Sequence, residues 1–225
     1  MARTLQSDSF GRNVLVAVLV AFVCSLAVSS AVYVLRPIEL AYRSIDRNRA
    51  ILVAAGLAAP GESLSDREIV ERFLALEPRL VDLDTDALTT AAAVKIGAHD
   101  YRAVLDDPDR CRQIDGALDV AGLGRRPQLM PVYVRHPGAG GASDEIERVV
   151  VPVCGSGMWS RLHGFVGLGA DLATIEAVAF DEQGETPGLG DRIQDPAWTA
   201  TWAGAPMYAE DGSLVFRIRG VRGDT

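Results

Sequence analysis

The chain opens with one long apolar run, and its hydrophobic pattern changes twice after that run. Residues 14–35, VLVAVLVAFVCSLAVSSAVYVL, hold no charge and are bracketed by Arg12 and Arg36. A helix of this length rises about 1.5 Å per residue and covers the roughly 30 Å hydrocarbon core of a bilayer. The pattern therefore predicts a single membrane helix, assigned to residues 14–36, after an N-terminal tail of residues 1–13.

Two other interpretations of this run are less consistent with its length and composition. A cleaved signal peptide has an acceptable small-residue site at residues 29–31. The apolar region of a signal peptide is usually about 7–15 residues long, which is shorter than this run. A core helix of a soluble domain would need a polar face, and the run has none.

Helical spacing continues beyond the span. Apolar positions between residues 38 and 52 fall three or four apart, which predicts a juxtamembrane helix ending near Gly56. Ser65 and Glu68 then form an S-x-x-E capping box that opens a further helix, and residues 77–78, Glu-Pro, close it. The apolar face of that helix would consist of Ile69, Phe73 and Leu76.

The pattern changes from helical to strand-like near residue 129. Residues 82–126 predict a second small helical region, with an alanine-rich helix candidate at residues 89–105. We assign residues 37–128 to a juxtamembrane and helical part of the soluble domain. Short runs of β-branched and aromatic residues follow at 131–135, 147–153, 162–168, 174–180 and 213–219. The predicted class is α+β, in which an anchor helix and a helical segment precede a mostly antiparallel sheet in residues 129–225.

Charge is distributed unevenly along the chain. Residues 1–50 contain six arginines and three acidic residues, whereas the rest contains 16 basic and 27 acidic residues. An acidic body repels phosphate backbones, so no nucleic-acid partner is expected. Four arginines follow the span closely, which by itself mildly favours a cytoplasmic location for the C-terminal side.

Common catalytic and metal-binding patterns are missing from the sequence. His99, His136 and His163 lie on three different predicted elements without a neighbouring ligand, so we expect no metal site. The chain holds neither a G-x-S-x-G nor an H-E-x-x-H pattern, and we assign no catalytic residue. Cys111 and Cys154 would pair in an oxidising compartment or remain separate thiols, and their spacing leaves both possibilities open.

One window, residues 155–193, is unusually rich in glycine and contains eight of them. Such density indicates tight turns or a close approach of backbone to a ligand. The turn at residues 185–190, Glu-Thr-Pro-Gly-Leu-Gly, offers a hydroxyl, a carboxylate and several backbone N–H groups for a planar heterocycle or a phosphate. The alternative is an ordinary Pro-Gly turn between two strands.

The motifs of this window resemble the NqrC family, one of the subunits of the bacterial Na⁺-translocating NADH:quinone reductase. They are the E-T-P-G-L-G turn, the upstream G-x-G-M-W-S, the lead-in F-x-E-Q-G-E and the downstream D-P-A-W-x-A-x-W. The N-terminal segments S-D-S-F-G-R-N and I-D-R-N-R-A-I-L-V-A-A-G-L are similar to that family as well. The resemblance covers both ends of the chain and is weakest across residues 82–128.

The resemblance implies a function in electron transfer. Members of that family have one membrane helix and a large domain on the periplasmic side of the inner membrane, a placement that we prefer to the arginine count. They carry FMN, installed by a flavin transferase, and relay single electrons between membrane-embedded centres and a flavin on a second flavin-carrying subunit, NqrB. The six-subunit complex oxidises NADH, reduces quinone and pumps sodium, so the family member is not expected to be active alone. The alternatives are an FMN carrier like the electron-transport flavoprotein of the Rnf complex or a non-redox membrane-tethered scaffold.

The resemblance also assigns the residues that line the flavin. These are Trp159, Glu185, Thr186, Leu189 and Gly190. Thr186 would form a hydrogen bond to the cofactor, Leu189 would pack on its ring, and Trp159 would be an aromatic wall. Such contacts set the reduction potential through polarity and solvent exclusion, whereas the redox chemistry belongs to the flavin.

The sequence departs from the family at the covalent attachment site. The family joins FMN through its phosphate to the threonine of an S-G-A-T motif, and this motif occurs nowhere in the chain. Thr225 lacks the preceding Ser-Gly-Ala, so we identify no attachment residue. We expect that the C-terminal end of the FMN-binding part is truncated and that the chain holds FMN weakly or not at all.

Overall fold

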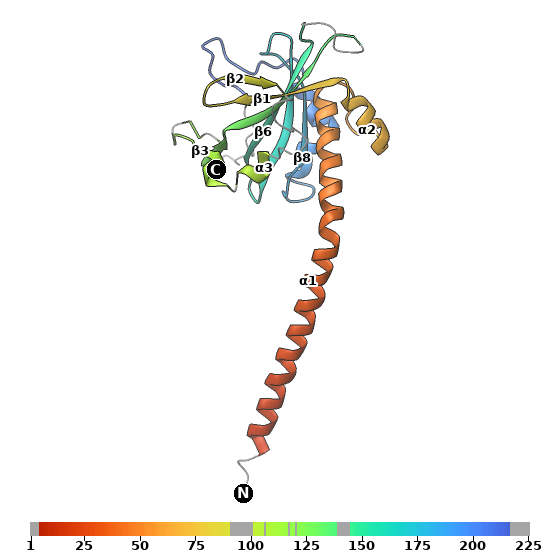
Figure 1. Ribbon diagram of the computed structural model, residues 1–225, viewed down its shortest axis with the longest axis vertical. Coiled ribbons are helices and arrows are strands. Elements are labelled where there is room, and N and C mark those ends of the chain that lie inside the picture. Colours follow the sequence, from red (N-terminus) through yellow and green to blue (C-terminus); the bar gives the residue numbers. More distant parts are fainter. Residues whose placement is uncertain are drawn as a thin grey trace. The chain divides into compact units, whose positions relative to one another are not determined.

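The computed structural model describes residues 5–90, 101–105, 107–116, 118–119, 121–138 and 145–216 (Figure 1). Its helices are α1 (Leu5–Ala54), α2 (Asp66–Phe73), α3 (Tyr101–Val104) and α4 (Pro196–Thr199), with 3₁₀ turns η3 (Pro108–Arg110), η4 (Asp191–Gln194) and η5 (Ala200–Trp202). Its strands are β1 (Leu76–Asp82), β2 (Ala87–Thr90), β3 (Cys111–Gln113), β4 (Arg125–Pro127), β5 (Leu129–Arg135), β6 (Arg148–Ser156), β7 (Arg161–Gly169) and β8 (Ile175–Glu182).

The chain forms two compact units, Met1–Ser44 and Ile45–Thr225, and α1 is continuous through both. Within α1, the stretch Phe10–Ala54 is long and apolar enough to cross a membrane. The predicted N-terminal apolar helix is therefore confirmed. It runs well beyond the span at residues 14–36, and Pro37 lies inside it.

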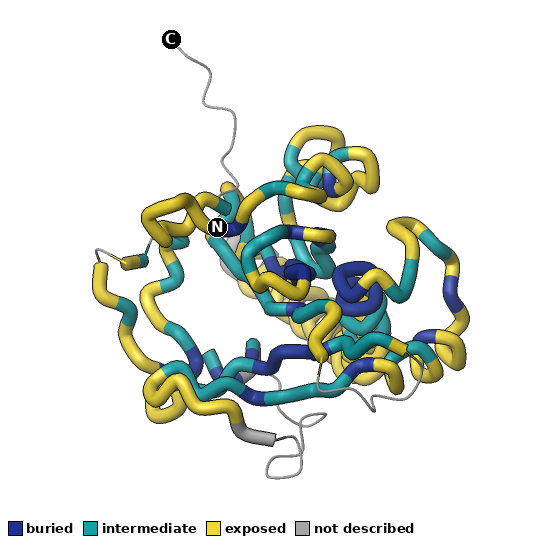
Figure 2. Tube along the Cα trace, turned by 90° about the horizontal axis from the view of Figure 1, so that it is seen from above, coloured by how far each residue is buried: buried dark blue, intermediate teal, exposed yellow. Residues whose placement is uncertain are grey.

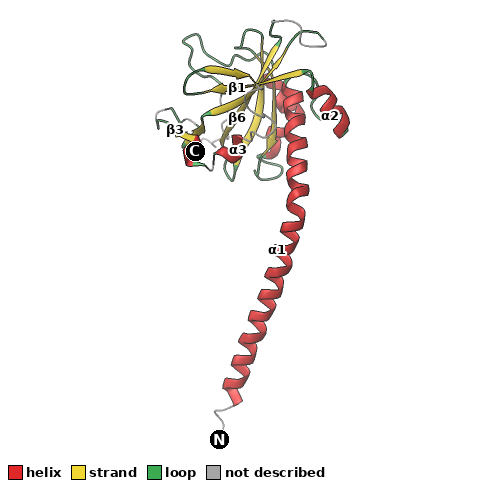
Figure 3. Ribbon diagram, in the orientation of Figure 1, coloured by secondary structure: helices red, strands yellow, loops and turns green. Residues whose placement is uncertain are grey.

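The second unit is built on one six-stranded sheet in the order β2-β1-β5-β6-β7-β8, drawn in yellow in Figure 3. Every neighbouring pair in it is antiparallel. This confirms the α+β class and the four predicted runs that became β5 to β8. The fifth run forms no strand within the described residues, where only an isolated bridge joins Tyr208 and Leu214. The rest of that run, from residue 217, lies outside the described residues.

The predicted helical segment contributes strands to the fold, which corrects two expectations. Helix α2 ends at Phe73, and Leu76 begins β1 rather than continuing the helical face. Pro78 is compatible with a strand, and β1 pairs with β5 over its whole length, so tertiary pairing outweighs the helix propensity of this stretch. Residues 87–90, 111–113 and 125–127 are likewise strands within the predicted helical region. The helix candidate at 89–105 is helical only over α3, and residues 91–100 lie outside the described residues.

The core lies on both faces of β7. Phe165 packs with the buried end of α1, residues 50–55, whereas the next residue, Val166, joins a second cluster with Met207 (Figure 2). Successive side chains of a strand point to opposite faces, so β7 is covered on both sides. The last turns of the long helix are thus part of the core of the second unit.

The C-terminus of α1 is held by strand residues. Arg135 Nη1 donates to the carbonyl oxygen of Ala55 at 2.9 Å, and Arg148 Nη1 donates to that of Ala54 at 3.2 Å. Gly56 has φ +68°, as expected for the glycine that ends a helix. A Cβ at Gly167 of β7 would overlap the carbonyl oxygen of Ala54, so this glycine allows the helix end to lie directly on the sheet.

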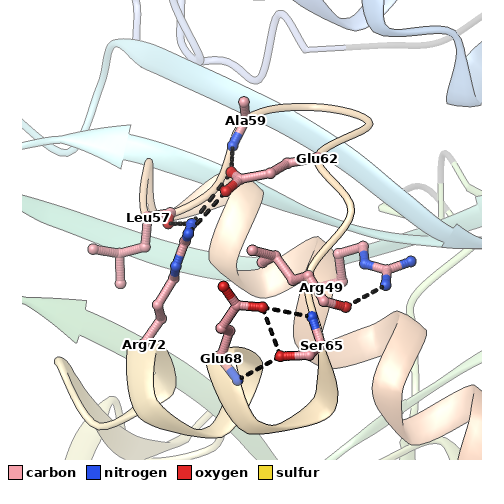
Figure 4. A network of polar contacts seen from close by, with 8 residues as sticks. Arg49, Leu57, Ala59, Glu62, Ser65, Glu68 and Arg72 are labelled. Atoms are coloured by element: carbon pink, nitrogen blue, oxygen red, sulfur yellow. Dashed lines mark hydrogen bonds and ion pairs between the residues drawn. The ribbon is translucent and has the colours of Figure 1, made fainter.

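Helix α2 begins as predicted. Ser65 and Glu68 form the capping box, with the Ser65 N–H donating to Glu68 Oε2 at 2.8 Å (Figure 4). Arg72 then donates to the carbonyl oxygen of Leu57 and to Glu62 Oε1, both at 2.8 Å. The hydrogen bond from Arg72 lowers the pKa of Glu62, and together these contacts fix the loop between α1 and α2.

Candidate functional site

The predicted site residues lie on two loops at the same end of the sheet. One loop, residues 157–160, joins β6 to β7, and the other, residues 183–190, follows β8. Both β6 and β8 run antiparallel to β7, and His163 near the start of β7 is in register with Cys154 and Glu182. The antiparallel arrangement therefore brings the two loops together.

Glu185 connects these loops through its carboxylate. Oε1 accepts hydrogen bonds from the N–H groups of Trp159 and Ser160 at 3.2 and 3.3 Å, and Oε2 accepts one from Met158 at 3.2 Å. Three successive backbone donors thus converge on one anionic group, a geometry that favours a negative charge. The Glu185 side chain faces the neighbouring loop of its own chain.

The N–H groups of the second loop donate largely within the two loops, which corrects the expectation that several are free for a ligand. The bonds are Gly184 N to Ser160 Oγ (2.7 Å), Glu185 N to Gln183 Oε1 (2.7 Å), Gly188 N to Asp191 Oδ1 (2.8 Å), Leu189 N to Thr186 O (3.1 Å) and Gly190 N to Thr186 O (3.0 Å). The turn satisfies its own donors because Pro187 and Gly188, with φ +79°, bring its carbonyl and amide groups together.

Large apolar side chains on these loops are exposed. The exposed fraction is 72% for Trp159, 76% for Leu189 and 81% for Met158. Two loops that hydrogen-bond to each other therefore present an aromatic and two aliphatic groups to solvent. Such groups suit a planar, largely apolar ring, because aromatic and aliphatic side chains form most of the lining of cofactor sites.

The two cavities of the second unit lie elsewhere. One, of about 570 Å³, is lined mainly by apolar residues that include Cys154, Phe180, Met207 and Phe216. The other, of about 300 Å³, is lined by residues that include Arg49, Ala50, Asp181, Gln194 and Thr199. None of the five predicted flavin-lining residues lines either cavity. The five residues consequently form an exposed surface and not a closed pocket.

A buried ion pair lies where β8 leads into the second loop. Arg102 of α3 contacts Asp181 at 2.8 Å and Glu182 at 3.1 Å, and only 2% of the Asp181 side chain is exposed. Burial raises the pKa of Asp181, and the Arg102 guanidinium opposes that shift. Burial also raises the pKa of the neighbouring Tyr101 to about 12. These contacts fix α3 against the end of β8.

Comparison with known proteins places this surface inside a recognised domain. Residues 157–218 match the model of the FMN-binding domain, and this stretch contains both loops. The NqrC subunit of the Na⁺-translocating NADH-quinone reductase of Yersinia pestis is 32% identical over 213 residues, which cover 94% of this chain and 77% of the relative. The NqrC subunit of Pseudomonas aeruginosa is 33% identical over 212 residues, which cover 94% and 78%.

The chain belongs to the NqrC family. A solved structure agrees: the crystal structure of Shewanella oneidensis NqrC superimposes with a TM-score of 0.67 at 29% identity and covers 81% of this chain and 80% of that one. As a member of the NqrC family, the protein is a component of the Na⁺-translocating NADH-quinone reductase, an oxidoreductase complex. Its apolar helix α1 indicates membrane anchoring.

The structure of this NqrC-family chain brings together some of the predicted residues more directly than others. Glu185 contacts the backbone of Trp159, and its Cβ lies beside Gly190, whereas Thr186 contributes its carbonyl oxygen to the turn. Sequence reasoning missed Ser160, which accepts the Gly184 N–H. Ser160 lies in the quoted G-M-W-S motif, so the position was visible in the sequence, although the role of its hydroxyl was not.

The cysteines and histidines do not contribute to this surface. Cys111 and Cys154 are free thiols, and Cys111 Sγ donates to the carbonyl oxygen of Val104 at 3.1 Å. Burial raises the pKa of Cys154. Among the described residues no group of three histidine, cysteine or acidic side chains is arranged to hold a metal ion, and His99 lies outside them.

Proposed function

We propose that this NqrC-family chain binds FMN on the surface of the two loops and relays single electrons within the Na⁺-translocating NADH-quinone reductase. The observation that carries this proposal is the match of residues 157–218 to the FMN-binding domain. The exposed Trp159 and Leu189, held on hydrogen-bonded loops, fit a planar ring system. The names of the relatives supply the reaction of the complex, NADH oxidation coupled to quinone reduction and sodium translocation.

The chain offers FMN a defined set of contacts. Trp159 and Leu189 would pack on the ring and exclude water, and the exposed Thr186 would donate or accept a hydrogen bond at its edge. Glu185 and Gly190 shape the turn that carries them. FMN, when bound, supplies the one-electron redox chemistry, and the protein residues tune it through polarity and solvent exclusion.

We propose further that these residues hold FMN without a phosphoester bond to this chain. The sequence contains no S-G-A-T motif, and Thr225 lacks the residues that precede the attachment threonine. Denaturing the purified holoprotein and filtering it should leave the flavin fluorescence in the filtrate. Fluorescence that stays with the denatured protein would show a covalent bond and contradict this part of the proposal.

The partners and the location also belong to the proposal. We place α1 in the bacterial inner membrane and the second unit in the periplasm, facing NqrB and the other membrane-embedded subunits, with a flavin transferase acting in maturation. Alkaline phosphatase is active only in the periplasm, so its fusion to the C-terminus should be active. Activity found instead with a cytoplasmic reporter would reverse the orientation.

The central experiment measures FMN bound by the full chain in detergent. Titration with FMN should quench its fluorescence with saturation at one equivalent. The double variant Trp159→Ala/Leu189→Ala should lose most of this binding, whereas Tyr208→Ala, an exposed aromatic change outside both loops, should not. A chain that binds no FMN, alone or in the assembled complex, would support the scaffold alternative.

A further inference from the structure

The two loops of the candidate site are joined by a set of contacts that does not depend on a ligand. The Glu185 carboxylate accepts the three N–H groups of Met158, Trp159 and Ser160, and Ser160 Oγ accepts the N–H of Gly184 at 2.7 Å. Within the first loop, the Gly157 N–H donates to the Ser160 carbonyl oxygen at 2.8 Å. We call the Glu185 and Ser160 contacts between the loops the clasp.

Three glycines of the window are required by the clasp. A Cβ at Gly157 would overlap Glu185 Oε1, and a Cβ at Gly190 would lie 2.5 Å from the Glu185 Cβ. A Cβ at Gly184 would lie 3.0 Å from the Ser160 hydroxyl oxygen. The absence of side chains here lets the carboxylate and the hydroxyl enter between the loops. Part of the glycine density is therefore explained by contacts between the loops.

We propose that Ser160 and Glu185 are positioning residues of the flavin site. They hold Trp159 and Leu189, one on each loop, in the arrangement that receives the ring, so that ring binding does not have to order the loops. This inference rests on the proposed FMN function. Hydrogen bonds to a carboxylate are about twice as strong as neutral ones, so Glu185 is the main element of the clasp. Preorganised loops bind more tightly because less conformational entropy is lost on binding.

This role differs from direct contact between Glu185 and the cofactor. Both carboxylate oxygens are already engaged by backbone donors of the other loop. A ligand group that took either oxygen would have to break these bonds and would release the loop that carries Trp159. A positioning role and a ligand role consequently predict different effects on the amides of the first loop.

The first measurement tests the clasp without flavin. Hydrogen exchange is followed by NMR for the Met158, Trp159 and Ser160 amides of the full chain in detergent. In Glu185→Gln, and more mildly for the Gly184 amide in Ser160→Ala, exchange should become about tenfold faster, because a charged or neutral acceptor is lost. The matched controls Glu210→Gln and Ser63→Ala, at exposed positions outside the loops, should leave these rates unchanged. Unchanged rates in both clasp variants would overturn the proposal.

The second measurement uses FMN as the probe. Both clasp variants should lower FMN affinity about 5- to 20-fold and change the circular dichroism of the bound flavin bands, which reports ring orientation. Faster exchange with unchanged affinity and unchanged flavin dichroism would overturn the positioning role. A loss of affinity without faster exchange would overturn it as well and would make Glu185 a direct ligand.

The two proposals fail in different ways. If the unsubstituted chain bound no FMN, the proposed function and the flavin role of the clasp would both be contradicted, while the exchange rates would still show whether the clasp joins the loops. If the unsubstituted chain bound FMN and the variants matched it in exchange, affinity and dichroism, only the clasp would be rejected. Because Ser160→Ala removes one neutral acceptor, it keeps the test decisive where Glu185→Gln lowers overall stability.

Discussion

At the scale of single residues, Thr186 separates the structure of the turn from its contact with a ligand. The N–H groups of Leu189 and Gly190 bond to its carbonyl oxygen, which any residue supplies. Its side chain belongs to an exposed residue. The hydroxyl is therefore available for a ligand, whereas the turn depends on the backbone.

The first prediction follows from this separation. Thr186→Ala should lower FMN affinity about 5- to 10-fold, the usual effect of losing one hydrogen bond, while the melting temperature of the protein without flavin stays within about 1–2 °C. FMN titration and thermal unfolding measure the two effects. Thr186→Ser keeps the hydroxyl and should retain most of the affinity. Equal affinity in all three proteins would remove Thr186 from the site.

A second residue-scale prediction concerns acid stability. Asp171, in the turn between β7 and β8, accepts hydrogen bonds from the Thr174 hydroxyl and from the N–H groups of Thr174 and Ala173, and these lower its pKa to about 2. A lowered pKa contributes stability that is fully present above the unfolded value of about 3.9 and is lost as pH falls through the folded value. Asp171→Asn should therefore lower the melting temperature at pH 7, and the difference should shrink between about pH 4 and pH 2. A difference that does not change over this range would contradict the assignment.

The sequence indicated which residues belong to the site better than it indicated what each one does. Trp159, Thr186 and Leu189 lie exposed on the two loops, as a cofactor surface requires, but their contact with FMN stays a prediction. The orientation of the Glu185 carboxylate depends on the pairing of β6, β7 and β8, which brings residues 26 positions apart into contact. No local pattern in the sequence specifies such a contact.

At the scale of elements, the end of α1 and strand β7 depend on each other. Residues 50–55 are buried, and the carbonyl oxygen of Ala54 lies against the backbone of Gly167. Arg135 and Arg148 bond to the last carbonyl groups of the helix, where positive charge is favoured by the helix dipole. The contact between helix and sheet thus leaves no space for a side chain at position 167.

The third prediction tests this contact. Gly167→Ala should destabilise the protein by about 2–3 kcal/mol, because either the helix end or the strand must shift to admit the methyl group. Chemical denaturation of the full chain in detergent provides the measurement. Gly155→Ala is the matched control, since a Cβ at that strand position meets nothing within 4 Å. Equal loss of stability in both variants would show that the cost is general to strand glycines.

Elements were predictable where the pattern was local. The capping box at Ser65 and Glu68 and the four runs that form β5 to β8 are visible in the sequence because each is specified within a few residues. Strand β1 was not, since Leu76 and Leu80, its buried residues, are four apart, as on a helix face. Its conformation is decided by pairing with β5, which lies about 50 residues later.

At the scale of the whole molecule, α1 serves two environments. Residues up to Ser44 form one unit, and the helix residues from Ile45 belong to the other, whose core includes Ile51 and Leu52. The apolar run at 14–35 has no such packing within the chain and suits a bilayer. A single helix is therefore both an anchor and a core element, with the change of role near residue 45.

The final prediction locates that change by truncation. A chain that starts at Ile45 keeps every buried residue of the helix and should be recovered without detergent, with a cooperative thermal transition. A chain that starts at Leu57 lacks residues 50–55, and losing several buried aliphatic side chains at about 2–4 kcal/mol each exceeds the usual stability of a domain. It should be insoluble or unfolded by circular dichroism. If the shorter chain folded as well as the longer one, the helix end would be dispensable for the core, and the contact of Ala54 with Gly167 would not be what stabilises β7.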